Sequence, residues 1–290
     1  MKKFVLGTAL LASSLFADVN SFTPYYGYIN YDSNKEKSQK DTASLFGLSY
    51  TKGNLAYLLE LGYSHFDATY KSDPTDPKSN LKQDNFTIAY SQYTKNYMSK
   101  VGYHFISTSD ETLGDGHTFQ YTLGAYKFNG YNKNTLGLES YYSLYVDGHD
   151  DNGTSKSINI FQFTPFVKIY RALSINSSNN LTLKLNYEIA MDYDDVDYLS
   201  YEIKDTFAYK SFFTTLNYYG GEMKTGVKDS GNTVYNSQDL LKTGYGIKLG
   251  YYLQPNAILS VGYSSNTYRE DGASQDGTNN IVVTTLNYTF

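Results

Sequence analysis

Four histidines are the side chains of this sequence best suited to acid–base chemistry near neutral pH. They are His65, His104, His117 and His149. His65 and His117 each have an aspartate two residues away. A hydrolase would need a nucleophilic serine held against such a histidine, and the sequence has no G-x-S-x-G motif. Because a short His–Asp spacing is common by chance, we expect no catalytic residues and no enzyme.

Two acid-rich segments could in principle bind calcium, DGHDDNG at 147–153 and DYDDVD at 192–197. Carboxylate oxygens are the ligands that this ion prefers. Neither segment meets the calcium-loop pattern, because Asn152 stands where glycine is needed and the glutamate at the twelfth position is missing. Runs of charge usually mark solvated loops. We therefore expect no metal site and no cofactor.

The elements that position these residues follow a period of two. In LAYLLELGYSHF (55–66), apolar residues at every second position from Leu55 to Tyr63 share one face, opposite Ala56, Leu58, Glu60, Gly62 and Ser64. Similar alternation occurs in 117–126, 181–191 and 243–253. Each apolar face is about ten residues long, which fits a tilted transmembrane strand better than the strands of about five or six residues in globular sheets. We find no helical period in residues 18–290, so we expect an all-β fold.

The connections alternate between short turns and long polar loops, as they do in outer-membrane barrels. By pattern we count about thirteen strands, and a barrel of this type needs an even number. The expected fourteenth is DYLSYEI at 197–203, turning near Lys204-Asp205. We therefore predict a closed antiparallel transmembrane β-barrel of about 14 strands, with 12 or 16 as alternatives. A secreted soluble β-sandwich is a weaker alternative, because its outward faces should be polar and its strands shorter.

If the apolar faces contact lipid, the opposite faces look into the barrel. The charged residues expected to line a pore are Glu60, Lys100, His104, Glu139, Lys168, Lys184, Glu188 and Lys248. A barrel of about eight strands is filled by side chains, whereas sixteen strands leave an aqueous channel. Around fourteen strands with inward glycines favour a water-filled lumen, and a plugged barrel is the alternative.

The first residues predict export. Lys2 and Lys3 precede an apolar run to Leu11 and small residues that end at Ala17, which is the layout of a signal peptide. We expect residues 1–17 to be the leader and 18–290 a single barrel domain. The absence of cysteine excludes disulfides. A net charge of −5 without a basic patch argues against nucleic acid as a partner.

The last ten residues, IVVTTLNYTF, resemble the C-terminal β-signal of Gram-negative outer-membrane proteins. The residues that match it are Val282, Leu286, Tyr288 and Phe290. Thr284 departs from the pattern, since an apolar residue is usual there. The resemblance implies an outer-membrane location and recognition by the barrel assembly machinery. In strand number and length the chain also resembles the monomeric porins.

The expected function is a porin-like channel for passive diffusion of small hydrophilic solutes or ions. The long loops are acidic, which predicts a weak cation preference. The alternative is a non-conducting surface barrel that binds a partner through these loops. Outer-membrane lipid and lipopolysaccharide are the expected surroundings. Tyrosines near strand ends fit girdles at the membrane interfaces. Examples are Tyr50, Tyr70, Tyr90, Tyr97, Tyr219 and Tyr268.

Overall fold

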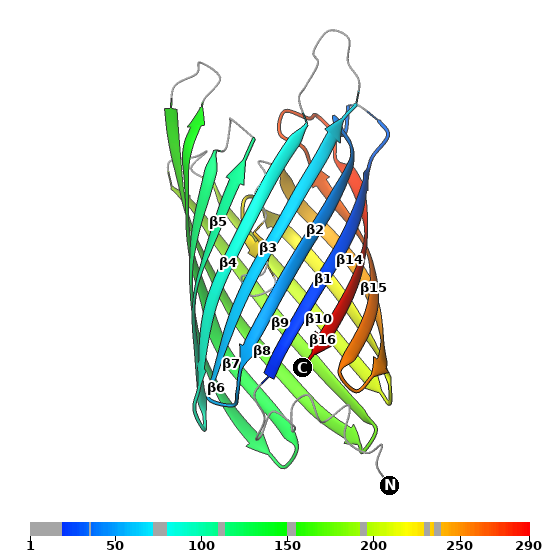
Figure 1. Cartoon of the computed structure of the whole chain (residues 1–290). Coiled ribbons are helices and arrows are strands. Elements are labelled where there is room, and N and C mark those ends of the chain that lie inside the picture. The colour runs from blue at the N-terminus through cyan, green and yellow to red at the C-terminus, as the bar shows by residue number, and fades with distance from the viewer. Residues whose placement is uncertain are drawn as a thin grey trace.

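The chain forms a closed antiparallel β-barrel of 14 strands (Figure 1). The computed structural model describes residues 19–34, 36–71, 80–109, 114–149, 155–191, 196–228, 233–234 and 239–290. The prediction of an all-β transmembrane-type barrel is confirmed, as is the preferred strand number. No helix long and apolar enough to cross a membrane occurs within these ranges.

The barrel strands are long and follow one another around the wall. They are β1 (Val19–Tyr31), β2 (Lys40–Gly53), β3 (Tyr57–Tyr70), β4 (Leu81–Tyr93), β5 (Tyr97–Thr108), β6 (Asp115–Asn129), β7 (Asn132–His149), β8 (Ser155–Ser174), β9 (Ser177–Met191), β10 (Asp197–Tyr209), β11 (Phe212–Met223), β14 (Leu240–Gln254), β15 (Ala257–Arg269) and β16 (Gly277–Thr289). β1 pairs with β16 and closes the barrel. The short strands β12 (Val227–Lys228) and β13 (Thr233–Val234) pair only with each other, so β11 pairs directly with β14.

The two ends of the barrel differ. At the end where β1 begins and β16 ends, the strands are joined by short turns, and the longer connections lie at the opposite end (Figure 1). We call these the turn end and the loop end. In outer-membrane barrels the short turns face the periplasm.

The fourteenth strand lies where it was expected, but its turn does not. β10 continues past Lys204-Asp205, and the chain reverses at Lys210-Ser211, where Lys210 has a φ of 53°. Asp205 remains in the strand because its carboxylate accepts a hydrogen bond of 2.6 Å from the Asn179 amide on β9. A polar residue paired across the sheet does not mark a turn.

The outer surface of the barrel is an apolar belt. On β14, Tyr245, Ile247, Leu249 and Tyr251 are exposed, while the alternate residues on this strand point into the barrel. Exposed apolar residues recur in the same way on the other barrel strands. An apolar surface of this extent is stable against lipid rather than water. The barrel therefore spans a membrane.

On its loop-end side the belt is bordered by five tyrosines whose hydroxyls bind polar groups on the next strand. The pairs are Tyr63 with Asp84, Tyr103 with His117, Tyr142 with Asn159, Tyr187 with Asp197 and Tyr263 with Asn280. In each pair the partner lies two residues beyond the position opposite the tyrosine, toward the loop end. We call this set the tyrosine ring. An apolar ring with a hydrogen-bonded hydroxyl suits the boundary between hydrocarbon and water.

The girdle prediction is wrong for two of its tyrosines. Tyr219 and Tyr268 are buried inside the barrel. The period of two explains both positions. Tyr219 follows the outward-facing Tyr218, and Tyr268 is an odd number of residues from the outward-facing Tyr263. Tyr90 and Tyr97 are exposed on the outside, as expected.

The belt predicts different costs for charge on the two faces of one strand. Leu249→Arg places a guanidinium against hydrocarbon, and we expect it to lower the free energy of unfolding by up to about 2–4 kcal/mol. Its neighbour Lys248 faces the interior, so Lys248→Arg should leave stability nearly unchanged. Urea titration of the refolded variants in phospholipid vesicles measures both. Equal stability of the two variants would contradict this orientation of β14.

Candidate channel and the residues that line it

The eight residues predicted to line a pore all lie on strand faces that look into the barrel. Five of them border one cavity of about 680 Å³: Glu60, His104, Lys168, Lys184 and Lys248. The other three, Lys100, Glu139 and Glu188, are buried beside or beyond this cavity. The cavity, which we call the chamber, extends from the turn end of the lumen past its middle. Thr51, Asn180 and Thr206 border it within three residues of the turn-end limits of their strands. Asn85 and His104 border it four residues from the loop-end limits of β4 and β5.

The chamber is lined by polar and charged side chains. Its lysines are Lys168, Lys184, Lys204 and Lys248, and its carboxylates are Glu60 and Glu202. Lys204 and Glu202 were missed in the sequence because the expected turn stood at 204–205. Continued alternation from Tyr198 through Ser200 to Glu202 and Lys204 was the available signal.

Two ion pairs fix lysines at the chamber wall. The Lys184 ammonium lies 2.8 Å from Glu139, and both side chains are almost fully buried. The Lys100 ammonium lies 2.9 Å from Glu60. A buried charge without a partner is costly, so each pair holds its lysine in place. The Lys168 ammonium lies 4.8 Å from the centre of the Phe166 ring, a favourable cation–π distance.

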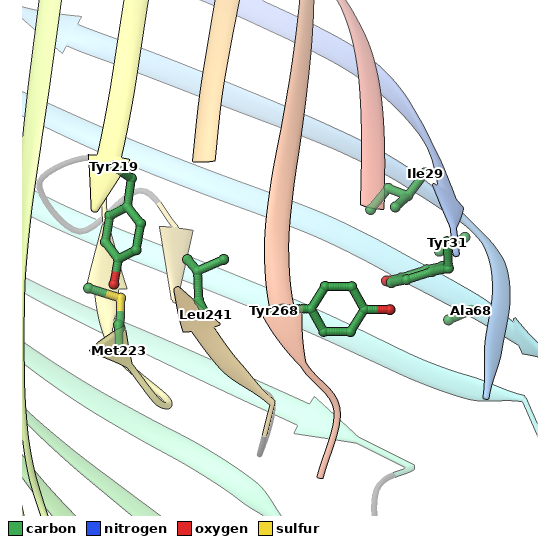
Figure 2. Close-up of a cluster of buried hydrophobic side chains, with 8 residues drawn as sticks. Ile29, Tyr31, Ala68, Tyr219, Met223, Leu241 and Tyr268 are labelled. Carbon is green, nitrogen blue, oxygen red and sulfur yellow. The ribbon is translucent and has the colours of Figure 1, made fainter. Parts of the chain in front are cut away.

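The loop-end half of the lumen contains two clusters of buried apolar side chains. Eight buried residues form what we call the loop-end cluster: Ile29, Tyr31, Ala43, Ala68, Tyr219, Met223, Leu241 and Tyr268 (Figure 2). Tyr31 and Tyr268 make an edge-to-face contact, with ring centroids 6.0 Å apart. A second group, the wall cluster, comprises Ile106, Tyr141, Tyr145, Ile158, Ile160 and Val227. These apolar clusters lie beside buried charged groups at the loop end, such as Lys40 and Asp239.

Val227 belongs to a stretch that enters the lumen after β11. We call residues 224–228 the crossing segment. Val227 donates a hydrogen bond of 2.7 Å to the Gln162 side chain and accepts one of 2.9 Å from it. The Lys224 amide donates to the Glu188 carboxylate at 3.3 Å. Gln162 lies on β8, three strands from β11 in the wall, and Ile106 of the wall cluster lies on β5. The crossing segment therefore lies inside the barrel rather than above it.

At the loop end, contacts of charged side chains join several connections of the barrel around the crossing segment. Lys40 and Asp239 form a buried ion pair with the nitrogen and oxygen 2.5 Å apart. The Glu270 carboxylate accepts a hydrogen bond of 2.9 Å from the Gln39 amide. Lys71 donates to the backbone carbonyls of Asp32 and Ser38. These contacts join the connections β1–β2 and β15–β16 to the residue that precedes β14.

Acidic residues in the described part of the β15–β16 connection have basic partners. Asp276 lies 2.9 Å from the Lys242 ammonium and 2.8 Å from the Arg269 guanidinium. Burial acts to raise the pKa of Asp276, but the hydrogen bonds from these two cations lower it below its ordinary value. Asp276 is thus ionised and largely neutralised by its neighbours.

The histidines lie apart from one another. His104 faces the lumen, with its ring nitrogen 2.6 Å from the Thr87 hydroxyl. His65 and His117 face outward and bind Asp84 and the Tyr103 hydroxyl. The side chain of His149 lies outside the described residues, as does most of the two acid-rich segments. Among the side chains that the structure describes, no group of three or more acidic or histidine residues is placed to hold a metal.

The residues of the predicted assembly signal lie on the closing strand. Val282, Leu286 and Tyr288 are exposed on the outer face of β16. The Phe290 amide donates a hydrogen bond of 2.9 Å to the Asn20 carbonyl on β1. Recognition of this strand by an assembly machinery stays a prediction.

Solved structures share this architecture at low sequence identity. The Ralstonia pickettii toluene transporter TbuX matches with a TM-score of 0.57 and 8% identity, over 96% of this chain and 91% of that one. The Pseudomonas putida toluene transporter TodX gives 0.54 and 10%, over 98% and 93%. The monoaromatic hydrocarbon channel CymD gives 0.55 and 8%, over 97% and 92%. No protein-family model matches the chain, and no curated protein matches it in sequence.

These matches establish the fold. The chain has the fold of outer-membrane β-barrel channels, and the three proteins compared above bear the names of transporters and a channel. A closed antiparallel barrel with an apolar belt and short turns at one end is the architecture of bacterial outer-membrane proteins. The chain is therefore an outer-membrane barrel.

The contacts of the crossing segment predict its dependence on Gln162. Gln162→Ala removes both hydrogen bonds to Val227, each worth about 0.5–1.5 kcal/mol. We expect the amide of Val227 to exchange its hydrogen roughly ten times faster or more, because local opening becomes easier. Hydrogen exchange followed by mass spectrometry on a peptide containing residues 224–228 measures this.

Asn134→Ala provides the control, because it removes a hydrogen bond of similar length to Arg171 at the turn end. This variant should leave exchange in the crossing segment unchanged. Unaltered exchange in Gln162→Ala would show that Gln162 does not hold the segment.

Proposed function

We propose that this protein is a porin-like channel through which small hydrophilic solutes cross the outer membrane by passive diffusion. The chamber carries this proposal. It is a cavity of about 680 Å³ inside a membrane-spanning barrel, with lysines, glutamates, hydroxyls and amides on its walls. Charged groups buried at this depth without solvent or partners would be costly. A lumen that holds water and polar solutes accounts for them.

The chemistry of the chamber favours hydrophilic cargo over hydrocarbon. TodX and CymD are named for monoaromatic hydrocarbons. A hydrocarbon in this chamber would have to displace water from four lysines and two glutamates, with no hydrogen bonds in return. We therefore assign this channel a different class of solute from those neighbours.

The crossing segment and the two apolar clusters set the narrowest part of the proposed path. They lie nearer the loop end than most of the chamber does, and His104 and Thr87 border both the chamber and a small cavity at Val227. A solute entering from outside would pass this region first. We propose that it limits the size of solutes, so that only small molecules reach the chamber.

Selectivity in the proposal has two opposing contributions. The long loops are rich in aspartate, which favours cations at the entrance. The chamber has four lysines against two glutamates and favours anions. We propose a weak cation preference overall, because the chain as a whole has a net charge of −5 and many of its aspartates and glutamates lie in the loops.

A second candidate is a non-conducting surface barrel that binds a partner through its loops. The packing of the loop-end half of the lumen favours it, because this region contains large side chains such as Tyr145, Tyr219 and Tyr268. In either case we propose outer-membrane lipid and lipopolysaccharide around the apolar belt, and the barrel assembly machinery as the partner of β16.

Conductance separates the two candidates. Reconstituted into a planar lipid bilayer, the refolded protein should show stable open levels in potassium chloride. Gln162→Ala should raise the open-channel conductance, because a loosened crossing segment leaves a wider path. Asn134→Ala should conduct like the unaltered protein. A correctly folded barrel that never opens would reject the channel and favour the surface barrel.

The charge of the chamber predicts a shift in ion selectivity. Under a tenfold gradient of potassium chloride, the unaltered channel should give a small reversal potential of cation-selective sign. Lys248→Gln removes one positive charge from the chamber and should increase the cation selectivity. Lys127→Gln, an exposed residue on the outside of β6, should change nothing. Anion selectivity of the unaltered channel would overturn the proposed preference.

A further inference from the structure

The lysines of the chamber lie together on one side of it. They are on β8, β9, β10 and β14, and we call Lys168, Lys184, Lys204 and Lys248 the basic wall. Thr182 on β9 stands opposite both Lys168 and Lys204 in the register. Because adjacent strands are about 4.8 Å apart, these two lysines leave the backbone roughly 10 Å from each other. Lys184 occupies the next inward position on the strand between them.

Among the described residues in and beside the chamber, lysines outnumber carboxylates. The chamber is lined by four lysines and by two glutamates, Glu60 and Glu202. Lys100 and Glu139 pair with residues that line the chamber and add one charge of each sign. Five lysines then stand against three glutamates, which leaves an excess of two positive charges. Lys168 is within electrostatic range of Glu139 first, and also of Lys100, Lys184 and Lys204, so three like charges act on it against one carboxylate. Like charges held together repel, and a bound anion relieves the repulsion.

The opposite side of the chamber is mostly neutral. Its residues on β2, β3 and β4 include Ser49, Thr51, Ser64, Asn85 and Thr87, with Glu60 among them. These side chains offer hydroxyl and amide groups but no positive charge. A negatively charged solute is therefore attracted to one side of the chamber and can make neutral hydrogen bonds on the other.

All the cationic side chains of the basic wall are lysines, which suit a ligand whose negative groups are separated. The two arginines of the sequence lie outside the chamber, because Arg171 binds Asn134 at the turn end and Arg269 binds Asp276 at the loop end. Arginine grips a single carboxylate or phosphate with two parallel hydrogen bonds, whereas lysine acts as a point charge. Several point charges spread over neighbouring strands match a ligand with several carboxylates better than one compact anion.

We infer that the basic wall is a binding site for small organic anions that have two or more carboxylate groups. This inference rests on the proposed function, since it names a class of solute that the chamber binds, while the acidic loops set the weak cation preference for small ions. The chamber volume lies within the range of about 300–1,000 Å³ common for small-molecule sites. Binding by lysines in a hydrated chamber is weak enough for release, which a conducting site requires.

Citrate is the probe, and calorimetry in detergent micelles measures its binding without the need for an open channel. The unaltered protein should bind citrate more tightly than acetate at matched ionic strength, and it should not bind glycerol. The double variant Lys168→Gln/Lys204→Gln should weaken citrate binding about tenfold or more, since it removes two of the charges that attract the carboxylates, each worth about threefold. Lys168→Arg/Lys204→Arg keeps both charges and should bind citrate within a few-fold of the unaltered protein.

The same variants in planar bilayers separate this inference from the channel proposal. Citrate should reduce the open-channel current at lower concentration than acetate, and the glutamine double variant should lose this block. Block that persists unchanged in that variant, or equal binding of citrate and acetate, overturns the inference while the channel stands. Citrate binding to a barrel that never conducts supports the site and rejects the channel.

Folding of each variant is checked by the heat-dependent shift of its band on a denaturing gel. If the glutamine double variant does not fold, the single variants Lys168→Gln and Lys204→Gln replace it, each with an expected loss of about threefold or more. If neither single variant weakens the binding of citrate, the basic wall is not the site.

Discussion

Backbone hydrogen bonding in hydrocarbon is the constraint on which the rest of this structure depends. An unpaired amide or carbonyl in lipid costs several kcal/mol, so a sheet that spans a membrane cannot have an open edge. The pairing of β1 with β16 removes the edge here. Once the sheet is closed, every strand must present one face to lipid and the other to the interior. The apolar belt, the chamber and the two internal clusters are all consequences of that division.

Local periodicity explains how much could be predicted from the sequence. A period of two assigns each side chain to a face without any knowledge of distant contacts, which is why the eight interior residues could be placed and why β14 could be oriented. The same rule, applied to Tyr218 and Tyr263, would have placed Tyr219 and Tyr268 inside. The turn after β10 was misplaced because Asp205 looks like a turn residue until its partner Asn179, 26 positions earlier, is known.

The crossing segment could not be predicted in this way. Gln162 and Val227 are 65 positions apart, and the sequence around each of them contains no pattern that predicts their contact. A mostly polar stretch such as 224–228, with Val227 as its one apolar side chain besides the threonine methyl, is compatible with a position in solvent. Only the arrangement of β5, β7 and β8 around a common apolar surface makes the interior favourable for Val227. Contacts of this kind depend on the closed barrel and form no periodic signal.

The tyrosine ring has a consequence for the depth of the barrel in the membrane. Five hydroxyls around the barrel, each bonded to a polar group on its loop-end side, oppose movement of the barrel along the membrane normal. Moving inward would draw these polar pairs into hydrocarbon, and moving outward would expose the rings to water. Small mismatches are then absorbed by local thickening or thinning of the bilayer. The ring thereby keeps the lysines of the chamber at a constant distance from the outer headgroups, whichever lipids surround the protein.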